Sequence, residues 1–281
     1  MSLGLGAGFY GIGPGAIGGG NEPTVISGDG NYVLVPLTGF NNYVDLGDAY
    51  QSTFRGSWTF STYFRISTGT DFAYFLGNRS VDGSLVIKDQ ILLWTQDGKA
   101  YSQNYANYDL HNVQTSSSHG SLISWNAQWQ HIAFSVMKNS SPSNTTIGIY
   151  INGSAVAHTT LAEMNETNHE QYTETKNLFL GAVSLAGSVG LSHRTFAFKH
   201  TAIWNTNLDA ANITEVSVSA NSMSSIGSQF NPLDLTSASG DYDTQGNLVA
   251  WWRMDDGTGV TAVDYSGNGN NATLVGDAVF F

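Results

Sequence analysis

The segment Ser57-Trp58-Thr59-Phe60-Ser61-Thr62-Tyr63-Phe64-Arg65-Ile66-Ser67 decides the fold class of this chain. Its large apolar side chains occupy alternate positions and share one face of an extended strand: Trp58, Phe60, Phe64 and Ile66. The opposite face carries Thr59, Ser61, Tyr63 and Arg65. Because side chains in a strand alternate with a period of two, this pattern predicts a half-buried antiparallel core strand.

The same alternation continues along the chain, and helical periodicity is nearly absent. Further strands are expected at residues 73–76, 91–95, 131–137, 147–151, 154–158, 178–181 and 194–204. Asn152-Gly153 predicts a tight hairpin, because both residues tolerate a positive φ. Only residues 161–174 and 209–218 have the pattern of short helices. These elements predict an all-β chain folded as a two-sheet antiparallel β-sandwich.

The composition limits the partners of the chain. Hydrophobic residues make up 41% of its 281 residues, enough for a large core, whereas charged residues make up only 11%. A net charge of −12 without a basic stripe argues against nucleic-acid binding. The chain has no cysteine, which excludes disulfides, thiolate metal sites and cysteine nucleophiles. No apolar stretch is long enough to span a bilayer, so no membrane insertion is expected.

Residues 1–20 form an extended glycine-rich arm. The arm cannot pack a core of its own, and it lacks the cationic start and continuous apolar run of a secretory signal peptide. We expect it to dock on a neighbouring subunit, with a mobile leader or packing within the chain as alternatives. The docking residues would be its scattered apolar side chains, Leu3, Leu5, Phe9, Tyr10, Ile12 and Ile17. A β-sandwich at residues 21–218, a polar loop at 219–246 and a C-terminal strand unit at 247–281, packed on the sandwich, are expected to follow.

Several short stretches, taken in order, resemble laminin-G-like or concanavalin A-like jelly-roll domains. The matching stretches are Tyr43-Val44-Asp45-Leu46-Gly47, Ser57-Trp58-Thr59-Phe60, Trp129-Gln130-His131-Ile132-Ala133-Phe134-Ser135, Ile149-Tyr150-Ile151-Asn152-Gly153, Leu178-Phe179-Leu180-Gly181 and Ala202-Ile203-Trp204-Asn205. Together they cover about residues 30–218. The closing unit, with Trp251-Trp252-Arg253-Met254-Asp255-Asp256 followed by Asp264-x-Ser266-Gly267-Asn268-Gly269-Asn270, is similar to a segment that usually opens these domains. The resemblance implies a concanavalin A-like jelly roll, and the late position of the closing unit leaves its strand order open.

The glycine-rich start, the missing signal peptide and the closing unit resemble laminin-G-like proteins carried by tailed bacteriophages, especially marine ones. This resemblance implies a non-enzymatic virion protein, extracellular on the capsid or tail surface, acting as a capsid decoration, cement or fibre-like protein in host adhesion. It would dock on the major coat protein or other virion subunits and expose a lectin-like sandwich to glycans. A free or cell-surface carbohydrate-binding module is the alternative, and a glycan hydrolase comes third. Low charge and free sheet edges also predict a possible homo-oligomer.

Residues 94–108 form the candidate glycan-binding segment. They offer rings that stack on apolar sugar faces and amides that hydrogen-bond sugar hydroxyls. These residues are Trp94, Tyr101, Tyr105, Tyr108, Gln103 and Asn104. The alternative is a long inter-strand loop whose tyrosines pin it to the sandwich.

The chain shows no pattern typical of catalysis, so no catalytic residues are expected. Glycosidases need two neighbouring carboxylates. The nearest acidic cluster has the helical spacing of a solvated helix face: Glu163, Glu166, Glu170 and Glu174. The seven histidines include no close metal-binding pair, and a structural, hydrogen-bonded role is expected for His131.

One loop has part of a calcium-binding pattern. Asp264, Ser266 and Asn268 match the first half of an Asp-x-Ser-x-Asn-Gly loop, but the twelfth position is Val275 instead of a bidentate glutamate. A glycine-rich turn is therefore preferred, with calcium as the weaker alternative. No other cofactor is expected.

Overall fold

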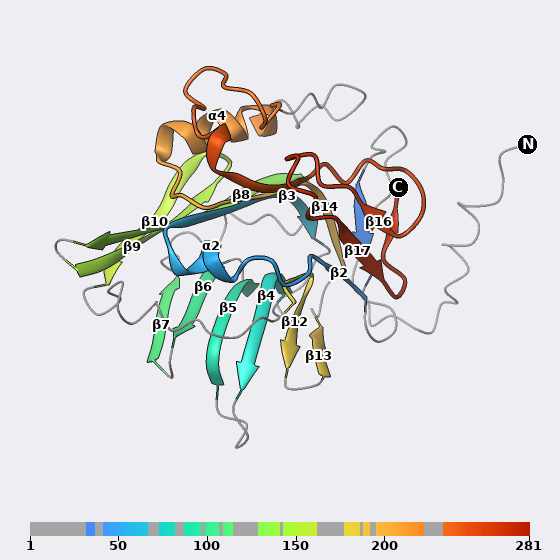
Figure 1. The fold of residues 1–281 in the computed structure, drawn as a ribbon, viewed down its shortest axis with the longest axis horizontal. Coiled ribbons are helices and arrows are strands. Elements are labelled where there is room, and N and C mark those ends of the chain that lie inside the picture. The colour runs from blue at the N-terminus through green and yellow to red at the C-terminus, as the bar shows by residue number, and fades with distance from the viewer. Residues whose placement is uncertain are drawn as a thin grey trace, which may run out of the picture.

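The computed structural model describes residues 32–36, 42–66, 73–81, 87–96, 99–106, 109–114, 129–140, 143–161, 177–185, 188–191, 195–221 and 233–281. Within these ranges most of the chain is β-structure, arranged as two antiparallel sheets in two layers (Figure 1). The predicted all-β, two-sheet sandwich is confirmed. The glycine-rich arm and residues 162–174 of the possible first helix lie outside the described residues.

In the described part of the chain the first sheet has eight strands, and its centre joins segments that are far apart in the sequence. Its spatial order is β10 (Ser154–Leu161), β9 (Ser143–Ile151), β8 (Gln130–Ser140), β3 (Trp58–Ile66), β14 (Phe196–Trp204), β1 (Val33–Val35) and β18 (Val279–Phe280), with β15 (Leu248–Trp252) also paired to β14. Asn152 and Gly153, with φ values of 49° and 79°, form the turn between β9 and β10. The predicted hairpin is therefore confirmed.

The second sheet also has eight strands. Its order is β16 (Thr261–Ala262), β17 (Ala272–Val275), β2 (Tyr43–Asp45), β11 (Phe179–Leu180), β4 (Ala73–Val81), β5 (Ile87–Gln96), β6 (Lys99–Ala106) and β7 (Asp109–Gln114). A separate hairpin is formed by β12 (Ala182–Leu185) and β13 (Ser188–Leu191). The C-terminal strands β15 and β18 belong to the first sheet, whereas β16 and β17 form one edge of the second. The last residues of the chain thus contribute to both layers.

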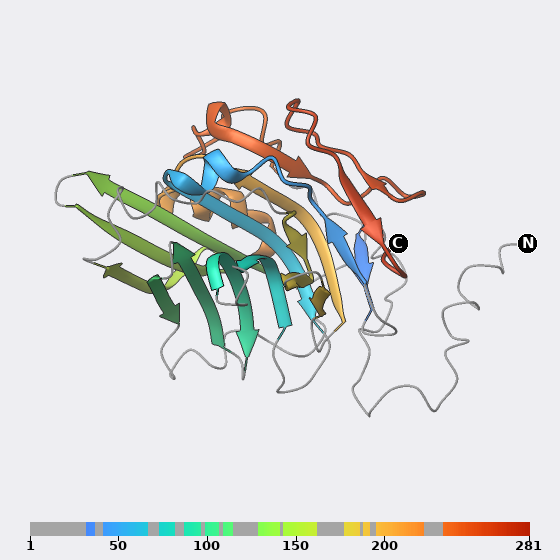
Figure 2. The same cartoon turned by 60° about the horizontal axis from the view of Figure 1, so that its bottom comes forward.

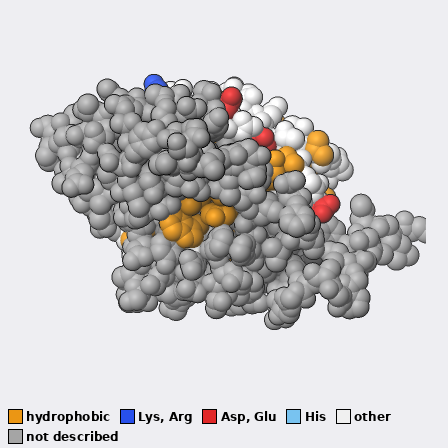
Figure 3. All heavy atoms as spheres, turned by 90° about the horizontal axis from the view of Figure 1, so that it is seen from below, with side chains coloured by type: hydrophobic (Ala, Val, Ile, Leu, Met, Phe, Trp, Pro, Cys, Tyr) orange, Lys and Arg blue, Asp and Glu red, His pale blue; other side chains and the backbone are white. Residues whose placement is uncertain are grey.

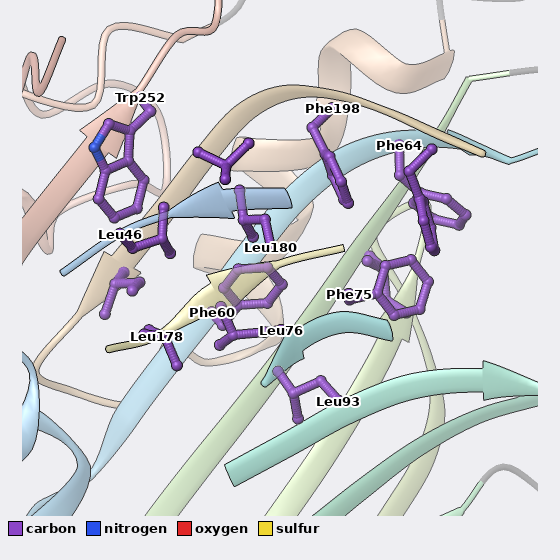
Figure 4. Close-up of a cluster of buried hydrophobic side chains, with 14 of the residues drawn as sticks. Leu46, Phe60, Phe64, Phe75, Leu76, Leu93, Leu178, Leu180, Phe198 and Trp252 are labelled. Atoms are coloured by element: carbon purple, nitrogen blue, oxygen red, sulfur yellow. The ribbon is translucent and has the colours of Figure 1, made fainter. Parts of the chain in front are cut away.

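The main core fills the space between the sheets, with aromatic and aliphatic side chains from both (Figure 4). Phe64 of β3 packs against Phe75 of β4, with ring centroids 4.7 Å apart. Trp252 of β15 packs edge-on against Tyr50, next to the short helix α2 (Gln51–Arg55), at 6.2 Å. Each of these four rings is buried, so contacts between the layers bury the apolar face that the alternation in β3 predicted.

The prediction that β3 is half-buried is wrong, because both of its faces are covered. Helix α4 (Ala210–Asn221), which confirms the predicted helix at residues 209–218, lies on the outer side of the first sheet (Figure 1). Ile213 and Val216 of α4 share a second apolar cluster with Trp204 of β14. The Tyr63 hydroxyl donates a 2.6 Å hydrogen bond to the Val216 carbonyl. The hydroxyl-bearing face of β3 is therefore a helix-packing surface.

The outer face of β3 also buries a cation. Arg65 is fully buried, and its guanidinium carbon lies 5.2 Å from the ring centroid of Tyr32 and 5.1 Å from that of Trp129. The Lys199 ammonium lies 4.9 Å from the Trp129 ring. Aromatic faces attract cations, so this surface accommodates charges that the sequence pattern assigned to solvent.

Two segments interpreted as possible loops contain ordered structure. The described part of residues 94–108 consists of the end of β5 and of β6. The sequence did not predict β6 as a strand, because its inward positions hold the small residues Ala100 and Ser102 and show no apolar pattern. In residues 219–246, Tyr242 is fully buried and its hydroxyl donates a hydrogen bond to the Leu235 carbonyl. The 3-10 helix η3 (Gln245–Asn247) then leads into β15, and residues 222–232 are not described.

Candidate binding surface

Strands β4, β5 and β6 bring three aromatic residues into one row across the second sheet. The strand register pairs Tyr74 with Trp94 and Trp94 with Tyr101. Directly paired residues of antiparallel strands share a face, with Cβ atoms about 5 Å apart. The structure thus joins two of the predicted glycan-binding residues. Sequence reasoning missed Tyr74, because only the pairing of β4 with β5 connects it to the row.

Tyr74 and Trp94 lie on the face of the sheet that points away from the core, and the register assigns position 101 to the same face. Leu93 and Thr95, which flank Trp94 in β5, are fully buried between the sheets. Tyr74 and Trp94 are only partly buried. The second sheet comes forward in Figure 2, and the view from below in Figure 3 shows exposed hydrophobic side chains in the middle of the molecule. Tyr74 and Trp94 therefore keep part of their surface accessible on this outer face.

The β12–β13 hairpin stands beside the aromatic row and packs on β4 at Gly77. A Cβ atom at Gly77 would lie 2.8 Å from the Ala182 carbonyl oxygen and 2.9 Å from Val183 Cβ, so this close approach requires glycine. Gly181, with a φ of 77°, turns the chain from β11 into β12. Because Gly77 pairs with Leu92, two residues before Trp94, the hairpin covers the face immediately next to the row.

Amide residues continue the row toward the edge of the sheet. Gln114 of β7 pairs with Tyr101, and Asn112 pairs with Gln103. Alternation along β6 assigns Gln103 and Tyr105 to the same face as Tyr101. The register also pairs Asn104 with the buried Ile91 and assigns it to the other face. The remaining predicted residues lie outside the described residues: Tyr108 and the docking residues Leu3, Leu5, Phe9, Tyr10, Ile12 and Ile17.

The loop with the partial calcium pattern is organised by hydrogen bonds to Asp264. One carboxylate oxygen accepts the backbone N–H groups of Trp251 and Ser266, each at 2.9 Å. The other accepts the Ser266 hydroxyl and the Asn270 backbone N–H, also at 2.9 Å. Asn268 turns away from the carboxylate and donates to the Leu248 and Val249 carbonyls. Asp264 therefore fastens the loop to β15 by hydrogen bonds, and calcium binding stays a prediction.

A serine and a histidine form a buried pair on the outer face of the first sheet. Ser61 Oγ lies 2.7 Å from His131 Nε2, and both side chains are almost completely buried. Burial lowers the pKa of His131 to about 3, so the imidazole is neutral at physiological pH and too weak a base for general-base catalysis. This contact gives His131 the structural, hydrogen-bonded role expected from the sequence.

Metal and membrane features give no further site in the described part of the chain. These residues contain no group of three or more His, Cys, Asp or Glu side chains that could hold a metal ion. None of their helices is long and apolar enough to cross a membrane. The acidic cluster Glu163, Glu166, Glu170 and Glu174 lies outside the described residues.

Comparisons with known proteins show the fold. No protein-family model and no curated protein matches the chain. Among solved structures, it is similar to a "putative carbohydrate binding protein" from Bacteroides ovatus, with a TM-score of 0.55 and 14% identity, covering 90% of this chain and 62% of that one. The chain thus spans less than two thirds of that protein. At this identity the likeness shows that the two chains share a β-sandwich fold.

Two other solved structures have lower scores. The Ruminococcus gnavus IT-sialidase CBM40 has a TM-score of 0.44 and 12% identity, covering 63% of this chain and 92% of that one. The botulinum neurotoxin serotype D binding domain has a TM-score of 0.44 and 10% identity, covering 71% of this chain and 44% of that one.

Proposed function

We propose that this chain is a non-enzymatic carbohydrate-binding protein that contacts glycans with the outer face of its second sheet. The observation that carries the proposal is the row of Tyr74, Trp94 and Tyr101 on three adjacent strands. The fold shared with a "putative carbohydrate binding protein" supports it.

The dimensions of the row suit sugar rings. Neighbouring strands lie about 4.8 Å apart, so the two ends of the row are separated by about 10 Å, roughly the length of two linked pyranoses. Aromatic faces bind the apolar C–H faces of pyranoses, and amides hydrogen-bond the hydroxyls at their rims. Gln103, Asn112 and Gln114 are the amide residues that the register assigns to the same face.

A glycan array probed with the purified chain tests the proposed function. Trp94→Ala should lower the array signals by about ten-fold, because it removes the central ring of the row. Thr273→Ala is the matched control, since this exposed residue lies on β17, near the opposite edge of the second sheet. Absence of any array signal from the wild type, or equal signals from Trp94→Ala and the wild type, would exclude this face as the glycan site.

The virion role and the docking of residues 1–20 on a coat lattice stay predictions from the sequence resemblance. Cosedimentation with empty capsids tests them, using the whole chain and a chain that begins at Asn21. Loss of capsid binding on truncation would support anchoring by the arm. Equal binding, or no binding by either form, would refute it.

A further inference from the structure

The loop unit between β15 and β17 carries exposed apolar side chains. Among the described residues, the exposed large hydrophobic side chains are Val260 at 60%, Val263 at 39% and Tyr265 at 37% of their full accessibility. All three fall within six consecutive residues around β16, at the edge of the second sheet. Of the three, Tyr265 has the aromatic ring, which is the side chain best suited to contact a ligand.

Tyr265 is held in a fixed orientation within this loop unit. Its backbone N–H donates to the Trp251 carbonyl at 2.8 Å, and its ring meets Trp251 edge-on, with centroids 6.1 Å apart. Its hydroxyl donates to Asp256 Oδ1 at 3.2 Å. Desolvation and the neighbouring Asp256 and Asp255 carboxylates raise the pKa of this hydroxyl, which keeps it protonated. A ring positioned in advance loses little conformational entropy when a ligand stacks on it.

Charged groups surround the ring. The Arg253 guanidinium carbon lies 4.9 Å from the Tyr265 ring centroid, and its Nη2 donates to Asp255 Oδ2 at 2.5 Å. Arg253 Nε is buried without a hydrogen-bond partner among the described residues, whereas the side chain as a whole is 40% exposed. Asp256 also accepts the Val263 backbone N–H at 3.2 Å through Oδ2. A hydrogen-bond donor and carboxylate acceptors thus adjoin a partly exposed aromatic ring.

We propose that Arg253, Asp255, Asp256 and Tyr265, together with the exposed valines, form a second glycan-contacting site, which takes a neutral sugar. This inference rests on the proposed function and adds a separate surface to it. The face of the ring that Arg253 does not cover would stack on the apolar face of a pyranose, while Asp256 accepts and Arg253 donates hydrogen bonds to hydroxyls at the ring edge. We name this group of residues the Tyr265 platform.

Electrostatics select the class of sugar. Asp255 and Asp256 place two carboxylates beside one guanidinium, and the whole chain carries a net charge of −12. A sialic acid or uronic acid would add a further negative charge against this field, whereas a neutral hexose would meet only hydrogen-bonding groups. Neutral oligosaccharides are therefore the fitting ligands.

The platform lies on a different surface from the aromatic row. Tyr265 packs on Trp251, whose side chain belongs to the apolar cluster on the outer side of the first sheet, whereas Trp94 lies on the outer side of the second sheet. One sugar unit therefore cannot occupy both sites. Two sites on one chain would raise the apparent affinity for a surface coated with glycans without any additional contact at either site.

The test compares four chains on an array of neutral glucose-, galactose- and mannose-terminated oligosaccharides and their sialylated counterparts. The chains are the wild type, Tyr265→Ala, Tyr265→Phe and Trp94→Ala, with folding checked by circular dichroism. Tyr265→Ala should lose about ten-fold in apparent affinity for a set of neutral glycans. Tyr265→Phe retains the stacking ring and should stay within about three-fold of the wild type. Trp94→Ala should retain the signals that depend on the Tyr265 platform.

Several results would overturn the inference, and they separate it from the proposed function. Wild-type signals that Trp94→Ala abolishes and Tyr265→Ala leaves unchanged would keep the proposed function and remove the second site. Signals from sialylated glycans that depend on Tyr265 would refute the neutral-sugar assignment. A shift from oligomer to monomer in sedimentation of Tyr265→Ala, with unchanged array signals, would identify the Tyr265 platform as a self-association surface. A wild-type chain without any array signal would remove both.

Discussion

Acidification should destabilise this protein, because two of its histidines are buried in neutral form. Burial lowers the pKa of His131 to about 3. Burial, with smaller contributions from Arg253 and Lys199, also lowers that of His200 to about 3. In the unfolded chain each imidazole has a pKa of about 6.5. Below that pH the unfolded state binds protons that the folded state does not, so the free energy of unfolding falls as the pH decreases from about 6.5 toward 3.

The size of this effect at moderately acidic pH follows from the unfolded state. At about pH 5, protonation stabilises each unfolded imidazole by about 2 kcal/mol, because one pH unit corresponds to about 1.4 kcal/mol. The value depends little on the pKa in the folded state as long as that pKa is well below 5. His131 and His200 together should therefore cost about 4 kcal/mol, a large share of the roughly 5–15 kcal/mol that stabilises a typical domain.

Urea unfolding at about pH 7.5 and about pH 5 measures this contribution. In His131→Gln and in His200→Gln, the decrease in unfolding free energy between the two pH values should be about 2 kcal/mol smaller than in the wild type. Each variant's own stability at the higher pH does not enter this difference, and titrating carboxylates affect all chains alike. If His131→Gln loses as much stability on acidification as the wild type, His131 is not held neutral by burial.

Three further substitutions test the packing around the sites by thermal and chemical denaturation. Gly77→Ala should destabilise the fold by about 1–3 kcal/mol, because its Cβ would lie 2.9 Å from Val183 Cβ; unchanged stability would show that β12 does not pack there. Tyr63→Phe removes the donor to the buried Val216 carbonyl and should cost about 1–2 kcal/mol; a neutral effect would argue against this helix-to-sheet contact. Asp264→Ala leaves the backbone donors of Trp251 and Asn270 unpaired and should lower the free energy of unfolding by about 3 kcal/mol or more. If calcium raises the melting temperature of the wild type, hydrogen bonds alone do not hold this loop.

Strands with an apolar face could be predicted from the sequence, whereas strand pairing and the covering of outer faces could not. The alternation in β3 identified the side chains that enter the main core. Its opposite face contacts Val216 of α4 and the segment around Leu208, which are distant in sequence, so local polarity suggested solvent exposure. Arg65 shows the same limit, because the aromatic rings of Tyr32 and Trp129 that contact it are distant in sequence.

The candidate site could be predicted in part, for the same physical reason. Trp94 and Tyr101 lie close together in the sequence and pair across the adjacent antiparallel strands β5 and β6, so a local pattern could suggest both. Tyr74 joins them only through the register between β4 and β5. The Tyr265 platform depends on the pairing of the segment around Asp264 with β15, which brings Tyr265 onto Trp251.

Adjacent tryptophans in β15 show why aromatic content alone is weak evidence for sugar binding. Successive residues of a strand point to opposite faces, so Trp252 enters the main core while Trp251 packs in the cluster on the outer side of the first sheet. Both rings are buried and serve packing. Trp94 occupies an outward position that no described element fully covers, and Tyr265 lies at the rim of the Trp251 cluster. Strand register and burial therefore distinguish the aromatic residues that can meet a ligand from those that hold the sandwich together.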